Sequence, residues 1–502
     1  NRKSSVKKFK SVELDFNLLK QTLQSATSRE TSNQVQTVLV LFPLENGKFE
    51  NFEIEKTNVL HPDLEANYPE ILSFYGVSKQ NALNKIYISI SPEGFTGLIT
   101  GEKTIYIDPV SKGNTTHYIV YDRTDCERST TDPFVCHADN SEFQTISKSI
   151  FTPVINNTTD GKLRTYKIAI ACTSEYSAYY GNTIPQVLAA MNTTITRVNS
   201  IYIRDLAVRF QIVADNNKLI YINGQNSVGS SDPYDNYNGS QMLNANTGNI
   251  NGIIGTANYN IGHVFSTGGG GIASTSPCNS TSKGNGVTGI VTPQFDPFDI
   301  DYVCHEIGHQ FGAGHTYYND CFGAKVADDY EPGSASTIMG YAGICAPNVQ
   351  SNSDAYFHAR SLEQMTAQIA SHSCETEVSH TNTEPIANAG GNYTIPKSTP
   401  FILNGSGSSD LDSADVLTYC WEQYNNDGAF TQPPVATNTG GPVFRSLTPT
   451  VDPYRTFPNL NAIINNQTPT WEVLPSVART LNFRLTVRDN NSNAPQTNSA
   501  NA

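Results

Sequence analysis

The sequence predicts a multidomain chain with a β-rich first domain, an α/β second domain containing a mixed sheet, and a final all-β sandwich. The chain has 502 residues, which is too many for one hydrophobic core. Short alternating runs fill the first 140 residues, whereas strand, helix and strand patterns follow one another after residue 161. Beyond residue 384, short strands alternate with Gly-, Ser-, Asn- and Asp-rich turns. We expect domains at residues 1–160, 161–378 and 384–492, and a tail at 493–502 that is disordered or leads into a further segment.

Composition excludes several classes of protein. The net charge of −14 argues against nucleic acid as a partner, because phosphate binding needs a basic face. No run of 18 apolar residues exists, so we expect no membrane span. Nine cysteines favour an exported protein with a few disulfides. No apolar segment precedes "NRKSSVKKFK", so we expect any secretion signal to have been removed or left out.

The first domain is predicted from runs with a period of two. "QTVLVLF" leads into a hairpin turn at Asn46-Gly47. The runs "NKIYISIS", "GEKTIYIDP" and "THYIVYD" follow, all rich in Ile, Tyr and Val. The stretch "NNTTDG", at residues 156–161, interrupts the pattern and indicates an exposed linker that a processing protease could cut.

The second domain begins with "KLRTYKIAIACTSEYS", a predicted buried strand. Pro185 opens a helix whose apolar residues keep helical spacing, and "LAVRFQIVA" returns to strand alternation. "GHVFSTGGGGIAS" follows as an apolar strand with four glycines. A late helix is predicted in "SDAYFHARSLEQMTAQIASHS".

The stretch "CHEIGHQFGAGH", from Cys304 to His315, indicates a metal site. If the segment is helical up to Phe311, His305 and His309 lie one turn apart, about 6 Å from each other on one face. Gly312 can end the helix with a sharp turn that returns His315 to the same ion. Three imidazoles leave the fourth position of a zinc tetrahedron open, which is the arrangement of a catalytic site.

Glu306 follows the first of these histidines, where its carboxylate could take a proton from water and pass it to a leaving amine. The alternative is a helix with surface histidines and a glycine cap. That alternative is disfavoured because Ile307 and Phe311 mark the helix as buried, and buried histidines need partners.

The motif "HEIGHQFGAGH" resembles the elongated zinc motif HExxHxxGxxH of the metzincin metallopeptidases, with every fixed position matched. "STIMGYAGIC" supplies Met339 for the methionine turn of that group, a hydrophobic floor under the metal. Together with "GHVFSTGGGGIAS", these motifs look most like bacterial reprolysin-like (adamalysin-like) members, over Lys162 to Cys374. The resemblance implies a secreted bacterial zinc endopeptidase with an inhibitory propeptide and a trailing PKD or immunoglobulin-like module.

Three further features of the sequence bear on this resemblance: the residue after the third histidine, a tyrosine after the methionine, and the glycine-rich segment. Thr316 stands where typical adamalysins have aspartate. Tyr341 lies two residues after Met339, where some metzincins carry a tyrosine that binds zinc and then stabilises the oxyanion; the alternative is an aromatic wall of the pocket. The resemblance also implies an edge strand that pairs with extended substrate, or alternatively a glycine-rich loop. Its candidate residues are Gly269, Gly270, Gly271, Ile272 and Ala273.

An inhibitory propeptide should occupy the open zinc position, and the related families use a cysteine or an aspartate for this. Cys136 is favoured because it lies nearer the domain junction and follows Phe134, an apolar anchor. Cys126 and Asp139 are the other candidates. A Cys126–Cys136 disulfide is an equally open alternative.

The remaining cysteines allow several pairings. Cys321 and Cys345 bracket the loop before the methionine turn, which makes a disulfide plausible. Cys172, Cys278 and Cys374 could supply another, and Cys304 is either a small buried residue or a disulfide partner. Cys420, beside Trp421, is expected to be a free thiol.

A calcium site is a further prediction for the last domain. Four aspartates, Asp410, Asp412, Asp415 and Asp489, lie in or near its turns and could supply oxygen ligands. The alternative is that they are solvated turn residues.

The leading function is therefore a zinc endopeptidase precursor that acts on protein or peptide substrates and is a monomer. Two alternatives remain: a binding protein that keeps its metal site without turnover, and a zinc hydrolase acting on a non-peptide amide. The catalytic carboxylate of Glu306 argues against the first, since a purely structural metal site does not need it.

Overall fold

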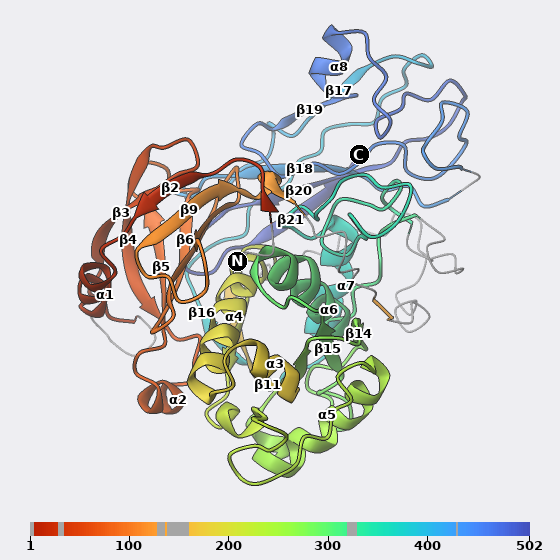
Figure 1. The fold of residues 1–502 in the computed structure, drawn as a ribbon. Helices are drawn as coiled ribbons and strands as arrows, with labels where there is room; N and C mark the ends of the chain where they lie inside the picture. The colour runs from red at the N-terminus through yellow and green to blue at the C-terminus, as the bar shows by residue number, and fades with distance from the viewer. Residues whose placement is uncertain (1–4, 29–34, 128–135, 138–159, 319–328, 428–429) are drawn as a thin grey trace.

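The computed structural model describes residues 5–28, 35–127, 136–137, 160–318, 329–427 and 430–502. Three groups of sheets follow one another along the chain (Figure 1). Among the described residues, no helix has the length and apolarity needed to cross a membrane.

The N-terminal region forms an eight-stranded antiparallel sheet in the order β2-β9-β8-β7-β6-β5-β4-β3. Its strands are β2 (Lys10–Glu13), β3 (Val38–Pro43), β4 (Phe49–Thr57), β5 (Leu72–Ser78), β6 (Lys85–Ser91), β7 (Gly94–Thr100), β8 (Ile105–Pro109) and β9 (His117–Asp122). The β3–β4 hairpin turns at Gly47, whose φ of +86° suits glycine. Helices α1 (Phe16–Gln24) and α2 (Pro62–Asn67) accompany the sheet, and β1 (Ser5–Val6) pairs with β10 (Cys126–Glu127).

The two faces of this sheet have different neighbours. One face covers a core of its own that includes Leu19 and Leu23 of α1. The other lies against α4 (Ile184–Leu206) of the next region, where Ser73 and Ser89 hydrogen-bond with Asn192 at 3.0 Å each. The N-terminal sheet therefore packs directly on the domain that follows it.

The central region is built on a mixed sheet in the order β12-β11-β13-β15-β14, with β16 also paired to β11. Its strands are β11 (Lys162–Cys172), β12 (Val208–Ile212), β13 (Ile261–Ser266), β14 (Gly271–Ala273), β15 (Gly286–Gly289) and β16 (Thr376–Ser379). Strands β11, β12, β13 and β15 run parallel, whereas β14 and β16 are antiparallel to their neighbours. This matches the α/β class with a mixed sheet that the sequence predicts.

Helices cover both faces of the central sheet. Side chains alternate along β11, so that Ile168 and Ile170 pack with α4 and the metal-motif helix, while Ala169 and Ala171 face α5 (Gly239–Ile254). The remaining helices are α3 (Ser174–Tyr179), η3 (Asn216–Leu219), η4 (Thr256–Asn258) and α7 (Ala359–Ala370). The metal motif therefore lies in the larger of two cores flanking one sheet.

The C-terminal region contains a two-stranded and a three-stranded antiparallel sheet. They comprise β17 (Phe401–Asn404), β18 (Thr418–Gln423), β19 (Tyr454–Phe457), β20 (Phe483–Arg488) and β21 (Thr497–Asn501), with one short helix, α8 (Leu460–Ile464). The prediction of a disordered tail at 493–502 is wrong, because β21 pairs along β20. The backbone hydrogen bonds of this pairing order a segment whose mostly polar side chains alone would not predict a strand.

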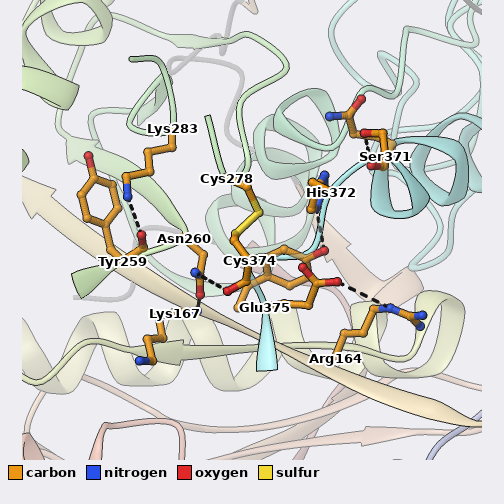
Figure 2. The surroundings of a disulfide bond; sticks show 12 residues. Arg164, Lys167, Tyr259, Asn260, Cys278, Lys283, Ser371, His372, Cys374 and Glu375 are labelled. Atoms are coloured by element: carbon orange, nitrogen blue, oxygen red, sulfur yellow. Dashed lines mark hydrogen bonds and ion pairs between the residues drawn. A yellow bond between two sulfur atoms is a disulfide. The ribbon is translucent and has the colours of Figure 1, made fainter. Parts of the chain in front are cut away.

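A disulfide joins Cys278 to Cys374, 96 residues later, just after α7 (Figure 2). The side-chain amide of Asn260 donates to the carbonyl oxygen of Cys374 at 2.8 Å. Both this hydrogen bond and the disulfide therefore attach the segment after α7 to the central region. Cys345 is also disulfide-bonded, and its predicted partner Cys321 lies outside the described residues. Cys126, Cys136, Cys172, Cys304 and Cys420 are buried and not disulfide-bonded, so the alternative of a Cys126–Cys136 disulfide is wrong.

Candidate metal centre

The metal motif lies on a continuous helical segment. A π-helical stretch, η5 (Pro297–Cys304), runs directly into α6 (His305–Gln310). Gly312 then turns the chain with a φ of +86°, a conformation that suits glycine. At Gly308, an added Cβ would lie 2.6 Å from the sulfur of Met339, so glycine leaves room for the methionine side chain as it packs under the helix.

The structure brings His305, His309 and His315 together. Their Nε2 atoms are 3.0 Å apart between His305 and His309, 3.1 Å between His309 and His315, and 3.2 Å between His305 and His315. A zinc tetrahedron with Zn–N bonds of about 2.0–2.1 Å places its nitrogens about 3.3 Å apart. The three imidazoles therefore have the spacing of a zinc site.

Hydrogen bonds fix which nitrogen of two of the imidazoles points inward. Nδ1 of His305 bonds to the Ile338 carbonyl at 2.7 Å, and Nδ1 of His309 bonds to the Ala313 carbonyl at 2.7 Å. A carbonyl only accepts, so the proton lies on Nδ1 and each Nε2 presents a lone pair. Burial lowers the pKa of His305 to about 4 and also lowers those of His309 and His315, so all three are neutral. Converging lone pairs in a buried site need a cation, and zinc fits these donors.

Glu306 is fully buried beside this group, and neither carboxylate oxygen has a hydrogen-bond partner among the described residues. Burial raises the pKa of Glu306 to about 8, while the nearby Cys136 thiol acts in the opposite direction. A carboxylate with two unsatisfied oxygens is costly to bury, so its retention here suits a chemical role.

Cys136 joins the three histidines. Its sulfur lies 3.5 Å from Nε2 of His309, and the four ligand atoms all lie within 4.8 Å of one another. Cys126 is buried elsewhere, beside β1, and Asp139 lies outside the described residues. Of the two candidate cysteines, Cys136 is the one that lies beside the three histidines.

Tyr341 lies next to the same group. Its ring is 4.7 Å from that of His315, and its hydroxyl donates to the backbone carbonyl of Cys136 at 3.1 Å. Burial raises the pKa of this phenol well above its ordinary value, so it is a donor throughout the physiological range. Met339 is fully buried beneath the helix, as a hydrophobic floor requires.

The predicted edge strand is shorter than the glycine run. Only Gly271, Ile272 and Ala273 form β14, whereas Gly269 and Gly270 have φ values of +82° and +69° and lie in the preceding turn. The expectation that all five residues offer strand hydrogen bonds is therefore wrong. The free edge of β14 is taken by the N-terminal region, because Cys136 bridges Gly271 and the amide of His137 donates to the Gly271 carbonyl at 2.7 Å.

Comparison with known families decides the identity of this domain. Residues 162–368 match the model described as metallo-peptidase family M12B, reprolysin-like. This segment belongs to the reprolysin-like metallopeptidases. The reprolysin-like domain is accordingly a zinc metalloprotease, which favours the predicted enzyme over a binding protein or a non-peptide hydrolase. A comparison with curated proteins found no match to the chain.

Two other groups of side chains outside the reprolysin-like motif were candidates for metals. Cys278, His372 and Glu375 lie close together, but the sulfur of Cys278 is bonded to Cys374 and is not free to bind a metal (Figure 2). The second group is in the C-terminal region, where three of the four predicted aspartates meet.

Oxygens of Asp410, Asp415 and Asp489 lie within 4.8 Å of one another, whereas Asp412 instead accepts from the Thr383 amide at 2.8 Å. Burial, helped by the charge of Asp415, raises the pKa of Asp489 to about 7. Calcium binding by these three carboxylates stays a prediction, which thermal melting with and without calcium would test: no rise in the melting temperature would count against it.

Some site residues carry no mark in the sequence. The carbonyls of Ile338 and Ala313 orient two histidines of the reprolysin-like domain, and backbone groups leave no trace in side-chain identity. Glu331 and Arg123 are buried charged residues in unremarkable sequence contexts. A search for charges inside Gly/Ser-rich stretches could have singled out Glu331, which precedes "PGSAS", but not Arg123, which stands among other charged residues in "YDRTDCE".

Proposed function

We propose that the chain is the precursor of a secreted zinc endopeptidase, kept inactive by its N-terminal region. The observation that carries this proposal is the meeting of three imidazole nitrogens, the Glu306 carboxylate and the Cys136 thiol in one buried site. The disulfide between Cys278 and Cys374 supports secretion, because such bonds persist in oxidising compartments.

His305, His309 and His315 would hold zinc, which when bound polarises a carbonyl and lowers the pKa of water. Glu306 takes the proton of the attacking water and returns it to the leaving amine. Its pKa of about 8, which a neighbouring cation would lower, lies near the range in which a carboxylate can both accept and donate a proton at neutral pH. Tyr341, once its hydroxyl is released from the Cys136 carbonyl, is placed to donate a hydrogen bond to the oxyanion.

The N-terminal region would inhibit the enzyme because it occupies two positions that the substrate and the attacking water need. The Cys136 thiolate would take the fourth zinc position, since sulfur is a good zinc ligand. The Cys136–His137 backbone also occupies the edge of β14, where an extended substrate would add as a strand. Substrate and N-terminal region therefore compete for both the metal and the strand edge.

The N-terminal region is also attached far from the metal. The amide of His61 donates to the Ile212 carbonyl at 2.8 Å, so the opposite edge of the central sheet is paired as well. Arg123 donates to Asp296 at 2.8 Å and to Asp301 at 2.6 Å. The hydroxyl of Tyr106 also donates to Asp296. Asp301 lies in η5 and Asp296 directly precedes it. These ion pairs therefore attach the N-terminal region to the segment that leads into α6, the helix of the zinc motif.

Cutting the linker should therefore leave the N-terminal region bound at the concentrations used for chromatography and free it only on dilution for an activity assay. Arg123→Met should release it already during chromatography. Breaking a buried ion pair costs about 3–5 kcal/mol, so we expect the nicked complex to weaken roughly 10²- to 10⁴-fold. Size-exclusion chromatography after a nick just before Asp160, an exposed residue, measures this directly.

Lys103→Met is the matched control, because the Lys103 side chain is 57% exposed and its ion pairs contribute little. If nicked wild-type protein separates at once, or Arg123→Met holds as tightly as wild type, the ion pairs do not retain the inhibitor.

The activity itself is tested by incubating the nicked chain with a broad peptide digest and identifying new amino termini by mass spectrometry. The proposal expects internal cleavage of many peptides. Absence of any new terminus, with zinc bound, would contradict endopeptidase function.

A further inference from the structure

The buried carboxylate of Glu331 hydrogen-bonds with two segments at once. One segment follows the third histidine, and the other is the methionine turn, which comprises residues 334–341. Glu331 is 1% exposed. Its Oε2 accepts from the hydroxyls of Thr316 at 2.7 Å and Thr337 at 2.5 Å. Its Oε1 accepts from the Ser336 amide at 3.0 Å, the Thr337 amide at 3.3 Å and the Ser336 hydroxyl at 3.2 Å. One carboxylate thus binds five donors.

Two of the residues that donate to Glu331 are next to groups that supply or orient a metal ligand. Thr316 directly follows His315, and its amide donates to the Met339 carbonyl at 3.2 Å. Thr337 directly precedes Ile338, whose carbonyl holds Nδ1 of His305 at 2.7 Å. The Glu331 carboxylate therefore fixes the backbone on both sides of the zinc site, one residue away from His315 and one residue away from the group that orients His305.

Among the residues that the structure describes, Glu331 forms no ion pair, and its side-chain hydrogen bonds all come from hydroxyl and backbone amide donors. A buried carboxylate without a counter-ion is costly unless it is fully hydrogen-bonded or lies near a positive charge. Glu331 meets the first condition through its five hydrogen bonds. It would meet the second if a divalent cation were bound, because the cation would lie on the other side of His315 and the methionine turn.

We propose that Glu331 is a positioning residue for the metal centre, holding His305 and His315 in register through the methionine turn and Thr316. The inference rests on the proposal that these histidines bind zinc. The proposal also explains why threonine is tolerated at position 316, directly after the third histidine, where typical adamalysins have aspartate. Glu331, fifteen residues further along the chain, brings a carboxylate to the same place.

The test measures zinc affinity of the full-length chain by competition with a chromophoric chelator, and the visible spectrum of the cobalt-substituted protein. Glu331→Gln keeps the shape but replaces one acceptor oxygen with a donor, so two or three N–H or O–H groups lose their acceptor. We expect zinc binding to weaken about 10- to 100-fold, the usual effect of losing a group that orients a ligand. The cobalt bands should shift, because they report ligand geometry.

Glu363→Gln is the matched control. Glu363 is also buried, at 6% exposed, and accepts hydrogen bonds from Arg360 and Tyr424, but it lies on α7 and contacts none of the methionine turn. Its replacement should lower the melting temperature and leave both the zinc affinity and the cobalt spectrum unchanged. A purely structural role for Glu331 would give the same pattern.

Thr316→Val removes one hydrogen bond and keeps the side-chain shape, so it answers the question even if Glu331→Gln folds poorly. We expect a smaller loss of zinc affinity, and a combined loss smaller than the sum when Thr316→Val is added to Glu331→Gln, because the Thr316 hydroxyl acts through the Glu331 carboxylate. Unchanged zinc affinity and cobalt spectrum in Thr316→Val and Glu331→Gln would overturn the positioning role. Failure of the wild-type chain to bind zinc would instead overturn the zinc proposal on which this inference rests.

Discussion

Replacing Glu306 by alanine is expected to lower kcat/KM of the activated enzyme about 10²- to 10⁴-fold while zinc stays bound. The reason is that Glu306 moves protons and supplies none of the three imidazole ligands. Its removal also relieves the cost of burying a carboxylate with no hydrogen-bond partner among the described residues, so stability should not fall. Steady-state cleavage of a fluorogenic peptide, together with zinc content, measures both effects.

Glu175→Ala is the control for this experiment, since Glu175 is an exposed acidic residue on α3 of the same domain. It should leave kcat/KM unchanged. If Glu306→Ala keeps more than a tenth of the wild-type rate, another group carries the proton and the assigned role is wrong.

Replacing Cys136 by serine is expected to make the uncut chain active. A serine hydroxyl is a poor zinc ligand compared with a thiolate, so the fourth position opens to water. The ion pairs of Arg123 and the strand bridge at Gly271 remain, so we expect only part of the activity of the nicked enzyme. The comparison is between intact and nicked forms of wild type and variant, measured with the same peptide.

Cys126→Ser controls for loss of a buried thiol in the same region, because Cys126 is buried and not disulfide-bonded but lies beside β1. Its intact form should remain silent. If the intact Cys136→Ser chain is as silent as wild type while both nicked forms are active, blocking of the strand edge causes the inhibition and the thiol does not.

The site could be predicted from sequence where spacing alone determines geometry. His305 and His309 share a helical face, and Gly312 is the residue type that a reversal at φ +86° requires, so the convergence of His315 follows from local rules. Glu331 could not be predicted in this way. Its role depends on the fold bringing residue 331 against Thr316 and the methionine turn, and a lone glutamate before a Pro-Gly pair does not indicate such contacts.

Elements with weak local preference were missed for a similar reason. Helix α5 has the sequence GSQMLNANTGNINGII, in which Asn and Gly disfavour a helix; an Asn238 cap and packing of Met242 and Ile250 on the central sheet stabilise it. Strand β21 is polar throughout and forms because β20 offers an edge. Sequence spacing also left Cys126 and Cys136 unresolved, since only the three-dimensional path of the chain brings one of them to His309.

The most direct test of the central claim is the rate at which the nicked chain cleaves gelatin before chelation, after removal of zinc, and after zinc is returned in one equivalent. The account predicts cleavage that disappears with the chelator and returns with a single zinc, and no cleavage by the intact chain under any of the three conditions. Cleavage that survives complete removal of zinc, or equal rates for intact and nicked chains, would contradict it.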